Sequence, residues 1–217
     1  MKIIALIYDL DDTILSTRSI PPATFKHVFD AIEYSNNGAL SKQFLQKAFE
    51  DLWRKPFDIV ALNFGFTESM IIAGRDALLN TKYKLSLVPF DDYRIVKEVG
   101  FKRFLVTTGI TNLQQAKIDS VINDGDFDEI IIDDPYDENR LGKQNIFADI
   151  ANRHVIEADQ FWIIGDNPDS EIKAGNALGM ITVQILRPGI ERTESSTYVI
   201  SNFNELKGMI EKHYINH

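Results

Sequence analysis

The sequence predicts an α/β fold, built as a doubly wound parallel sheet whose core is interrupted by an all-helical insert. From Arg103 onward, short runs of β-forming residues alternate with helical patterns, as in a parallel sheet covered on both faces. Between about Pro21 and Val88 only successive helical patterns are found. We therefore expect a Rossmann-like core formed by residues 1–16 and 89–217, and a helical cap formed by residues 17–88.

Short apolar runs rich in β-branched and aromatic residues mark the expected strands. They are Ile3–Tyr8, Arg103–Thr107, Glu129–Ile132, Gln160–Ile164, Ile181–Leu186 and, more weakly, Tyr198–Ile200. Helical spacing of apolar residues predicts the intervening helices and an amphipathic closing helix. These cover Thr111–Ile122, with Leu113, Ile118, Val121 and Ile122 as its apolar positions, and then Asn145–Arg153, Ser170–Leu178 before Gly179, and Phe203–Ile210.

The insert is predicted to contain helices around Phe25–Ile32, Phe44–Trp53 and Met70–Leu79. Ser41 and Thr67 are expected N-caps, because their hydroxyls can accept from the first free backbone N–H groups. A helical block in this position is typical of a lid over strand ends. A subdomain that merely adds core remains the alternative.

Composition limits the classes of function. The net charge of −9 argues against nucleic acid as a partner, because phosphate backbones require a basic surface. The absence of cysteine excludes disulfides, a thiol nucleophile and a thiolate metal site. The apolar run before Asp9 is too short for a signal peptide or a membrane span. We expect a soluble cytoplasmic protein with no membrane partner.

The first expected strand ends in carboxylates, Asp9 and Asp11, followed by Thr13. Residues two apart on a regular strand face the same side, and two anions there are costly without a cation or a shared proton. The pattern therefore favours a hard metal such as Mg²⁺, acid/base chemistry, or both. A surface turn after a strand is the alternative.

Three further sites follow later strands or begin helices. Thr107-Thr108-Gly109 offers a hydroxyl and backbone N–H groups at a strand–helix junction, which suits phosphate. Lys143 is expected at a helix start, where a cation needs nearby negative charge. Asp166 follows an apolar strand and Gly165, whose flexibility would let the backbone turn. Each site also has an ordinary structural explanation, as strand, cap, surface charge or turn.

All four sites lie at carboxyl ends of predicted strands or at starts of the following helices, where open α/β sheets bind ligands. In this order of motifs the chain resembles the haloacid dehalogenase-like (HAD) hydrolase superfamily, most of whose members are Mg²⁺-dependent phosphatases. The resemblance extends from the first strand to about Leu186. Two positions depart from the family pattern: Gln144 replaces the usual proline, and Glu171 stands where Asp is frequent, leaving Asp169 as an alternative.

The resemblance implies roles for the acidic residues. Asp9 would attack the phosphorus of a small phosphorylated metabolite and form an aspartyl-phosphate. Asp11 would protonate the leaving alcohol and then activate water. Mg²⁺ would be held by Asp9, the backbone carbonyl of Asp11, and Asp166.

The remaining motifs would bind the phosphate. Thr107 and the N–H groups of Thr108 and Gly109 would hold its oxygens, while Lys143 would offset the charge of nucleophile and phosphate. A phosphomutase would use the same residues. A phospho-accepting regulatory module, similar to response-regulator receivers, also combines acids, a hydroxyl and a lysine. A dehalogenase would need neither Mg²⁺ nor Asp11, and a metal-binding interaction protein without turnover is the last alternative.

Overall fold

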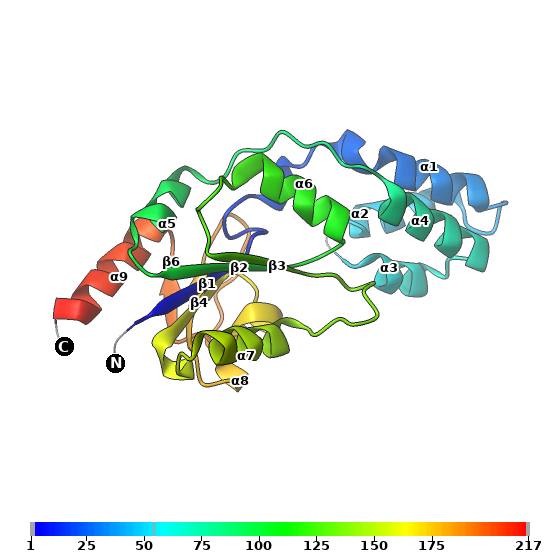
Figure 1. Cartoon of the computed structure of the whole chain (residues 1–217). Coiled ribbons are helices and arrows are strands. Elements are labelled where there is room, and N and C mark those ends of the chain that lie inside the picture. The colour runs from blue at the N-terminus through cyan, green and yellow to red at the C-terminus, as the bar shows by residue number, and fades with distance from the viewer. Residues whose placement is uncertain (1–2, 54, 216–217) are drawn as a thin grey trace. The chain divides into compact units, whose positions relative to one another are not determined.

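A computed structural model describes residues 3–53 and 55–215, the side chains of 213–215 excepted. The chain divides into two compact units, coloured along the sequence in Figure 1. One unit comprises Met1–Ser19 and Lys84–His217, and the other comprises Ile20–Tyr83. The sequence-based expectation for the second unit was 17–88. The role of the second unit as a cap stays a prediction.

The first unit contains a parallel six-stranded sheet within the described ranges, in the order β3-β2-β1-β4-β5-β6, which confirms the predicted fold class. The observed strands match the expected runs to within two residues at each end. They are β1 (Ala5–Tyr8), β2 (Lys102–Thr108), β3 (Glu129–Asp133), β4 (Phe161–Gly165), β5 (Ile181–Ile185) and β6 (Tyr198–Ile200).

Helices cover both faces of the sheet, as doubly wound topology requires. In Figure 1, α6 lies on one face, and α7 and α8 lie on the other. The helices of this unit are α5 (Arg94–Glu98), α6 (Thr111–Val121), α7 (Lys143–His154), α8 (Lys173–Ala177) and α9 (Phe203–Ile215). In the ranges described, no helix is both long and apolar enough to cross a membrane.

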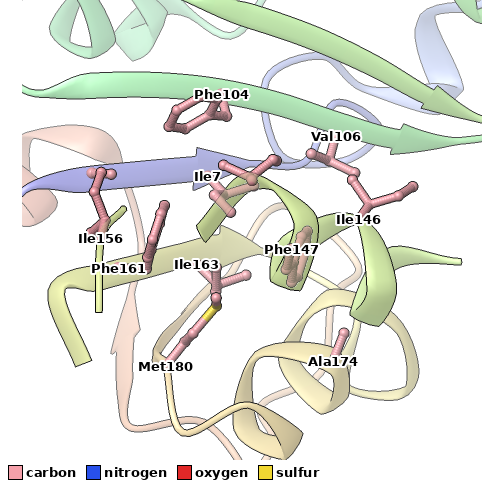
Figure 2. Close-up of a cluster of buried hydrophobic side chains, with 12 residues drawn as sticks. Ile7, Phe104, Val106, Ile146, Phe147, Ile156, Phe161, Ile163, Ala174 and Met180 are labelled. Carbon is pink, nitrogen blue, oxygen red and sulfur yellow. The ribbon is translucent and has the colours of Figure 1, made fainter. Parts of the chain in front are cut away.

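Alternation of side chains along the strands separates two cores. Ala5 and Ile7 of β1 point to the α7 face, where they join an apolar cluster with Phe147 (Figure 2). Tyr8 points to the opposite face, where its ring packs edge-on against Phe203, with ring centroids 5.8 Å apart. The central strands are therefore buried on both faces, which explains their nearly continuous apolar sequence.

The predicted helix Ser170–Leu178 has a different start. A π-helical turn covers Pro168–Ile172, and α8 follows it. The helix ends as predicted at Gly179, whose positive φ of 72° closes a Schellman motif. In that motif Gly179 N–H donates to the carbonyl of Asn176, and Met180 N–H donates to that of Gly175.

The second unit is helical throughout its regular elements: α1 (Lys26–Ser35), α2 (Lys42–Asp51), α3 (Phe57–Phe64) and α4 (Glu68–Asn80). The N-cap predictions for Ser41 and Thr67 are confirmed, since both hydroxyls accept from a backbone N–H three residues on. Helix α3 was not expected from the sequence. Gly74 lets the helices approach closely, because a Cβ there would lie 2.7 Å from the Phe57 ring.

The strand order determines where a ligand can bind. Chain connections run in opposite directions from β1 and β4, so the covering helices diverge at the carboxyl ends of these two strands. Open α/β sheets bind ligands in the crevice formed at such a switch point. Asp9 follows β1 and Asp166 follows β4, which places two of the predicted acids at this point.

Candidate active site

Asp9 and Asp166 are brought together by the pairing of β1 with β4. Tyr8 is in register with Ile164, and the N–H of Asp9 donates to the Ile164 carbonyl at 2.9 Å. With Glu171 these residues form a group in which one carboxylate oxygen from each lies within 4.8 Å of the others. The sheet therefore joins the first and last predicted motifs.

The turn after β1 presents Asp11 beside this group. The carbonyl of Leu10 accepts hydrogen bonds from the N–H groups of Thr13, Ile14 and Leu15, which closes a tight turn. Asp12 adopts a positive φ of 49°, and its carboxylate accepts from Thr17 N–H at 3.0 Å and Thr17 Oγ1 at 2.7 Å. Asp tolerates this conformation better than most residues, so the local sequence suits the turn.

Lys143 begins α7 and lies between two carboxylates. Its Nζ donates to Asp9 Oδ1 at 2.7 Å and to Glu171 Oε2 at 2.8 Å. All three side chains are buried. The cation expected to be unfavourable at a helix start is thus compensated by two anions, and a buried ammonium requires such partners. The structure places Lys143 against the predicted nucleophile.

Glu171, rather than Asp169, joins the acidic group. Its Oε1 accepts from the N–H of Asn167 at 2.6 Å, whereas Asp169 is exposed. Gly165 is needed for this arrangement, but for a different reason from the one expected. Its φ is not positive; instead, a Cβ at Gly165 would collide with the Glu171 side chain. The glycine provides room for the glutamate and is not required for a backbone turn.

The predicted phosphate motif lies at the end of β2. The Thr107 hydroxyl is buried and accepts from Gln114 Nε2 at 2.6 Å. Thr108 Oγ1 donates to Asp133 Oδ2 at 3.1 Å. The N–H of Gly109 donates to the Asp133 carbonyl at 3.2 Å, so this N–H already has a partner within the protein. Its expected contact with phosphate stays a prediction. The role of the Thr107 hydroxyl as a donor to phosphate stays a prediction.

Two residues of α6 that sequence reasoning missed contact Asp11. Lys117 Nζ donates to both Asp11 carboxylate oxygens, at 2.9 and 2.7 Å, and Gln114 Nε2 donates to Oδ2 at 3.1 Å. Gln114 and Lys117 share a helical stripe with Ile118 and Val121, all buried. Polar residues within an apolar stripe were the available signal. The expected apolar set instead included Leu113 and Ile122, which are only half-buried.

The segment that delivers Lys143 is held by Asp133 at the end of β3. This buried carboxylate accepts from Arg140 Nε at 3.0 Å and Nη2 at 2.8 Å, and from Gly142 N–H at 3.1 Å. Although burial opposes ionisation, these hydrogen bonds and the one from Thr108 lower the pKa of Asp133 below its usual value. Asp133 therefore acts as an ionised anchor for the turn before α7.

The charges of the site favour a divalent cation. The group contains three carboxylates, Asp9, Asp166 and Glu171, and one ammonium group, that of Lys143, which pairs with Asp9 and Glu171; two excess negative charges remain when all are ionised. Burial raises the pKa of Asp9 to about 7 despite the nearby Lys143. Burial and the charges of Asp9 and Glu171 raise the pKa of Asp166 to about 8. Carboxylate oxygens are the ligands that Mg²⁺ prefers, so these residues fit it.

Comparisons with known proteins agree with the motifs. A family model described as HAD-hydrolase-like matches residues 140–206, which include Lys143, Asp166 and Glu171. A glyceraldehyde 3-phosphate phosphatase of Methanopyrus kandleri is 26% identical over 199 residues, covering 84% of each chain. The enzyme of the same name from Methanocaldococcus jannaschii is 26% identical over 226 positions, covering 95% of this chain and 96% of the relative.

The fold also matches solved structures. A protein described as a HAD-hydrolase, YfnB from Bacillus subtilis, superposes with a TM-score of 0.62 and is 19% identical, covering 97% of this chain and 99% of that one. Its structure is described as bound to magnesium and as revealing interdomain movement. At this identity the match concerns the fold, and the site geometry described above carries the chemical argument.

Proposed function

Because this chain belongs to the haloacid dehalogenase-like hydrolase superfamily, we propose that it is a Mg²⁺-dependent phosphatase acting on a small phosphomonoester through a phosphorylated Asp9. The observation that supports this most is the buried contact of Lys143 with Asp9, at 2.7 Å, within a group that includes Asp166 and Glu171. Such a group supplies a nucleophile, a fixed cation and metal ligands at the carboxyl end of the sheet.

The names of the relatives suggest the substrate class. Both are glyceraldehyde 3-phosphate phosphatases, so a three-carbon phosphorylated aldehyde is the first compound to test. The identity of 26% supports a class of substrate, and closely similar small phosphomonoesters belong in the same panel. The net charge of −9 makes a large polyanionic substrate unfavourable.

In the first chemical step, an Asp9 oxygen attacks phosphorus and the bond to the leaving alcohol breaks. Lys143 remains hydrogen-bonded to Asp9 and offsets the negative charge that gathers around the phosphoryl group. The Thr107 hydroxyl donates to a phosphate oxygen. Phosphoryl transfer depends mainly on positioning and charge neutralisation, which these fixed groups provide.

Asp11 acts as the general acid in the first step and as the general base in the second. It gives a proton to the departing alkoxide and then removes one from the water that attacks the Asp9 phosphoryl group. Asp9 and Asp166, with the Asp11 backbone carbonyl, would hold Mg²⁺, which when bound would supply positive charge to neutralise the phosphate. Glu171 positions Lys143 and the Asn167 N–H, since each of its oxygens already accepts a hydrogen bond.

The test is phosphate release from a panel of phosphomonoesters that includes glyceraldehyde 3-phosphate, with Mg²⁺ and with EDTA. We expect Mg²⁺-dependent release by the wild type and a loss of at least about a thousandfold in Asp9→Asn, because the amide is a poor nucleophile. Asp124→Asn is the matched control, since Asp124 is exposed and lies in a loop. That control should keep wild-type activity.

Two results would count against the proposal. Full activity in Asp9→Asn would exclude Asp9 as the nucleophile. A wild type that releases no phosphate from any compound, but accumulates an acid-labile phosphate from a small phosphodonor, would favour the phosphomutase or receiver-like alternative.

A further inference from the structure

We propose that Lys117 and Gln114 of α6 are positioning residues that hold the Asp11 carboxylate for proton transfer to the leaving group. The role rests on the proposed phosphatase function, in which Asp11 is the acid and base. It assigns a purpose to a buried lysine that neither the metal group nor the phosphate contacts use.

The contacts define one orientation of Asp11. Lys117 bonds both carboxylate oxygens, and Gln114 adds a third hydrogen bond to Oδ2. The Asp11 side chain keeps 25% of its surface exposed, whereas that of Lys117 keeps 6%. The Asp11 carboxylate is thus hydrogen-bonded by α6 on one side and exposed to solvent on the other. The open side leaves the carboxylate within reach of a substrate, as proton transfer requires.

Stability alone does not account for Lys117. Taking an ammonium group out of water costs several kcal/mol, and an apolar side chain of similar volume usually serves a core as well or better. The neighbours of Lys117 in its helical stripe, Ile118 and Val121, are apolar and buried. In the described part of the chain, Lys117 Nζ donates hydrogen bonds to both oxygens of Asp11. The lysine is therefore matched to that carboxylate.

Gln114 links proton transfer to phosphate binding. Its Nε2 contacts Asp11 Oδ2 at 3.1 Å and the Thr107 hydroxyl at 2.6 Å. One amide thereby fixes the proposed acid relative to the proposed phosphate ligand. Gly109 makes this possible, because a Cβ there would lie 2.9 Å from the Gln114 side chain. Proton transfer depends steeply on such fixed geometry.

The two buried lysines consequently have separate tasks. Lys143 on α7 contacts the nucleophile Asp9, and Lys117 on α6 contacts Asp11. The two helices cover opposite faces of the sheet, as Figure 1 shows. The nucleophile and the acid are therefore contacted by lysines from two different helices.

The test compares kcat/KM for two substrates that differ in their need for a proton. An alkyl phosphate, glyceraldehyde 3-phosphate, leaves as a strongly basic alkoxide, whereas para-nitrophenyl phosphate leaves as a stable phenolate. In Lys117→Met we expect kcat/KM to fall about thirtyfold or more for the alkyl phosphate and about threefold or less for the aryl phosphate. Lys117→Arg, which keeps a cation, should recover most of the loss.

Lys97→Met is the matched control. Lys97 also pairs with a buried carboxylate of the same unit, Asp126 at 2.8 Å, but on α5. Lys97→Met should leave kcat/KM unchanged for both substrates. If Lys117→Met does not fold, Gln114→Leu carries the test, with a greater loss expected on the alkyl phosphate. Equal losses on both substrates, or none, would overturn the positioning role alone. A wild type inactive on both would overturn the phosphatase function and this role with it.

Discussion

Asp166 carries the least compensated charge of the acidic group. Within the described ranges, no lysine or arginine forms an ion pair with Asp166, whereas Asp9 and Glu171 share Lys143. Burial and the neighbouring anions raise the pKa of Asp166 from 3.8 to about 8. Without a metal, this carboxyl therefore retains a proton in the folded chain at pH values where the unfolded chain has released it.

This difference makes stability fall with rising pH. Between pH 3.8 and about 8 the folded state binds the extra proton, so the free energy of unfolding decreases across that window and stays low above it. Asp166→Asn removes the ionisation. In EDTA at pH 9 we expect the variant to be more stable than wild type by roughly 1–3 kcal/mol, and the gap to close by pH 4. Urea unfolding at both pH values measures it.

Asp169→Asn is the control, because Asp169 is exposed three residues away and should show no such dependence. Adding Mg²⁺ at pH 8 should raise the melting temperature of wild type and leave that of Asp166→Asn unchanged. A variant that is less stable than wild type at both pH values would contradict the account of Asp166.

Some of these residues could be predicted from the sequence, and others could not. Asp9 and Asp166 directly follow apolar strands, so their common edge was readable from the strand pattern alone. Lys143 was readable as a cation at a helix start. The only signal for Lys117 was its position in an apolar helical stripe, which indicates a buried residue but does not identify its partner. The partner of Lys117 lies 106 residues away.

Among the elements, the π-helical turn Pro168–Ile172 has the most direct link to the site. It places Glu171 over Gly165, from where the carboxylate reaches both Lys143 and the Asn167 N–H. The sequence indicated a helix in this region, but a π turn differs from an α turn by one residue per hydrogen bond. Local propensity does not separate the two.

Gly165→Ala tests this packing. Its Cβ would collide with the Glu171 side chain, so we expect a loss of about 2–3 kcal/mol in stability. Displacement of Glu171 would also deprive Lys143 of one of its two anions. Gly208→Ala provides the comparison, because nothing lies within 4 Å of a Cβ at this position in α9. There we expect a gain of about 0.5–1 kcal/mol.

Urea unfolding of both alanine variants is the measurement. If Gly165→Ala were as stable as wild type, the glycine would not be required for the fit of Glu171.

Helix α3 is a second element that the sequence pattern did not predict. Pro56 and Gly65 bound it as N-cap and C-cap, but its eight residues are mostly apolar and show weak periodicity, so its packing reveals it better than its pattern does.

Across the first unit, Arg187 connects segments that are distant in the sequence. Just after β5, its guanidinium donates to the Thr13 carbonyl at 2.9 and 3.1 Å and to both Asp92 oxygens at 3.0 Å. It also lies over the Phe90 and Phe203 rings, 4.1 and 4.9 Å from their centroids. The turn that presents Asp11, the chain returning from the helical insert, and α9 thus share one buried cation.

The planar fork of Arg187 matters as much as its charge. We expect Arg187→Lys to lose about 2 kcal/mol of stability, because an ammonium group cannot make both parallel pairs or stack on the rings. Arg187→Met should lose about 3–5 kcal/mol, since it leaves Asp92, whose side chain is only 10% exposed, without its cation. Urea unfolding distinguishes the two losses, with Arg192→Met, an exposed arginine, as a near-neutral control. Full stability in Arg187→Lys would reduce the role to charge alone.

The central place of β1 has a consequence for synthesis of the protein. This strand is translated before the other strands of the sheet, yet its neighbour β4 follows more than 150 residues later, and Asp9 meets Asp166 only then. At roughly 5–20 residues per second, the ribosome leaves one apolar edge of β1 without its partner for about 8–30 seconds. Nascent chains that stop before β4 would lack the site altogether and would expose a sticky strand edge. Both activity and solubility therefore depend on β4 being translated and pairing with β1.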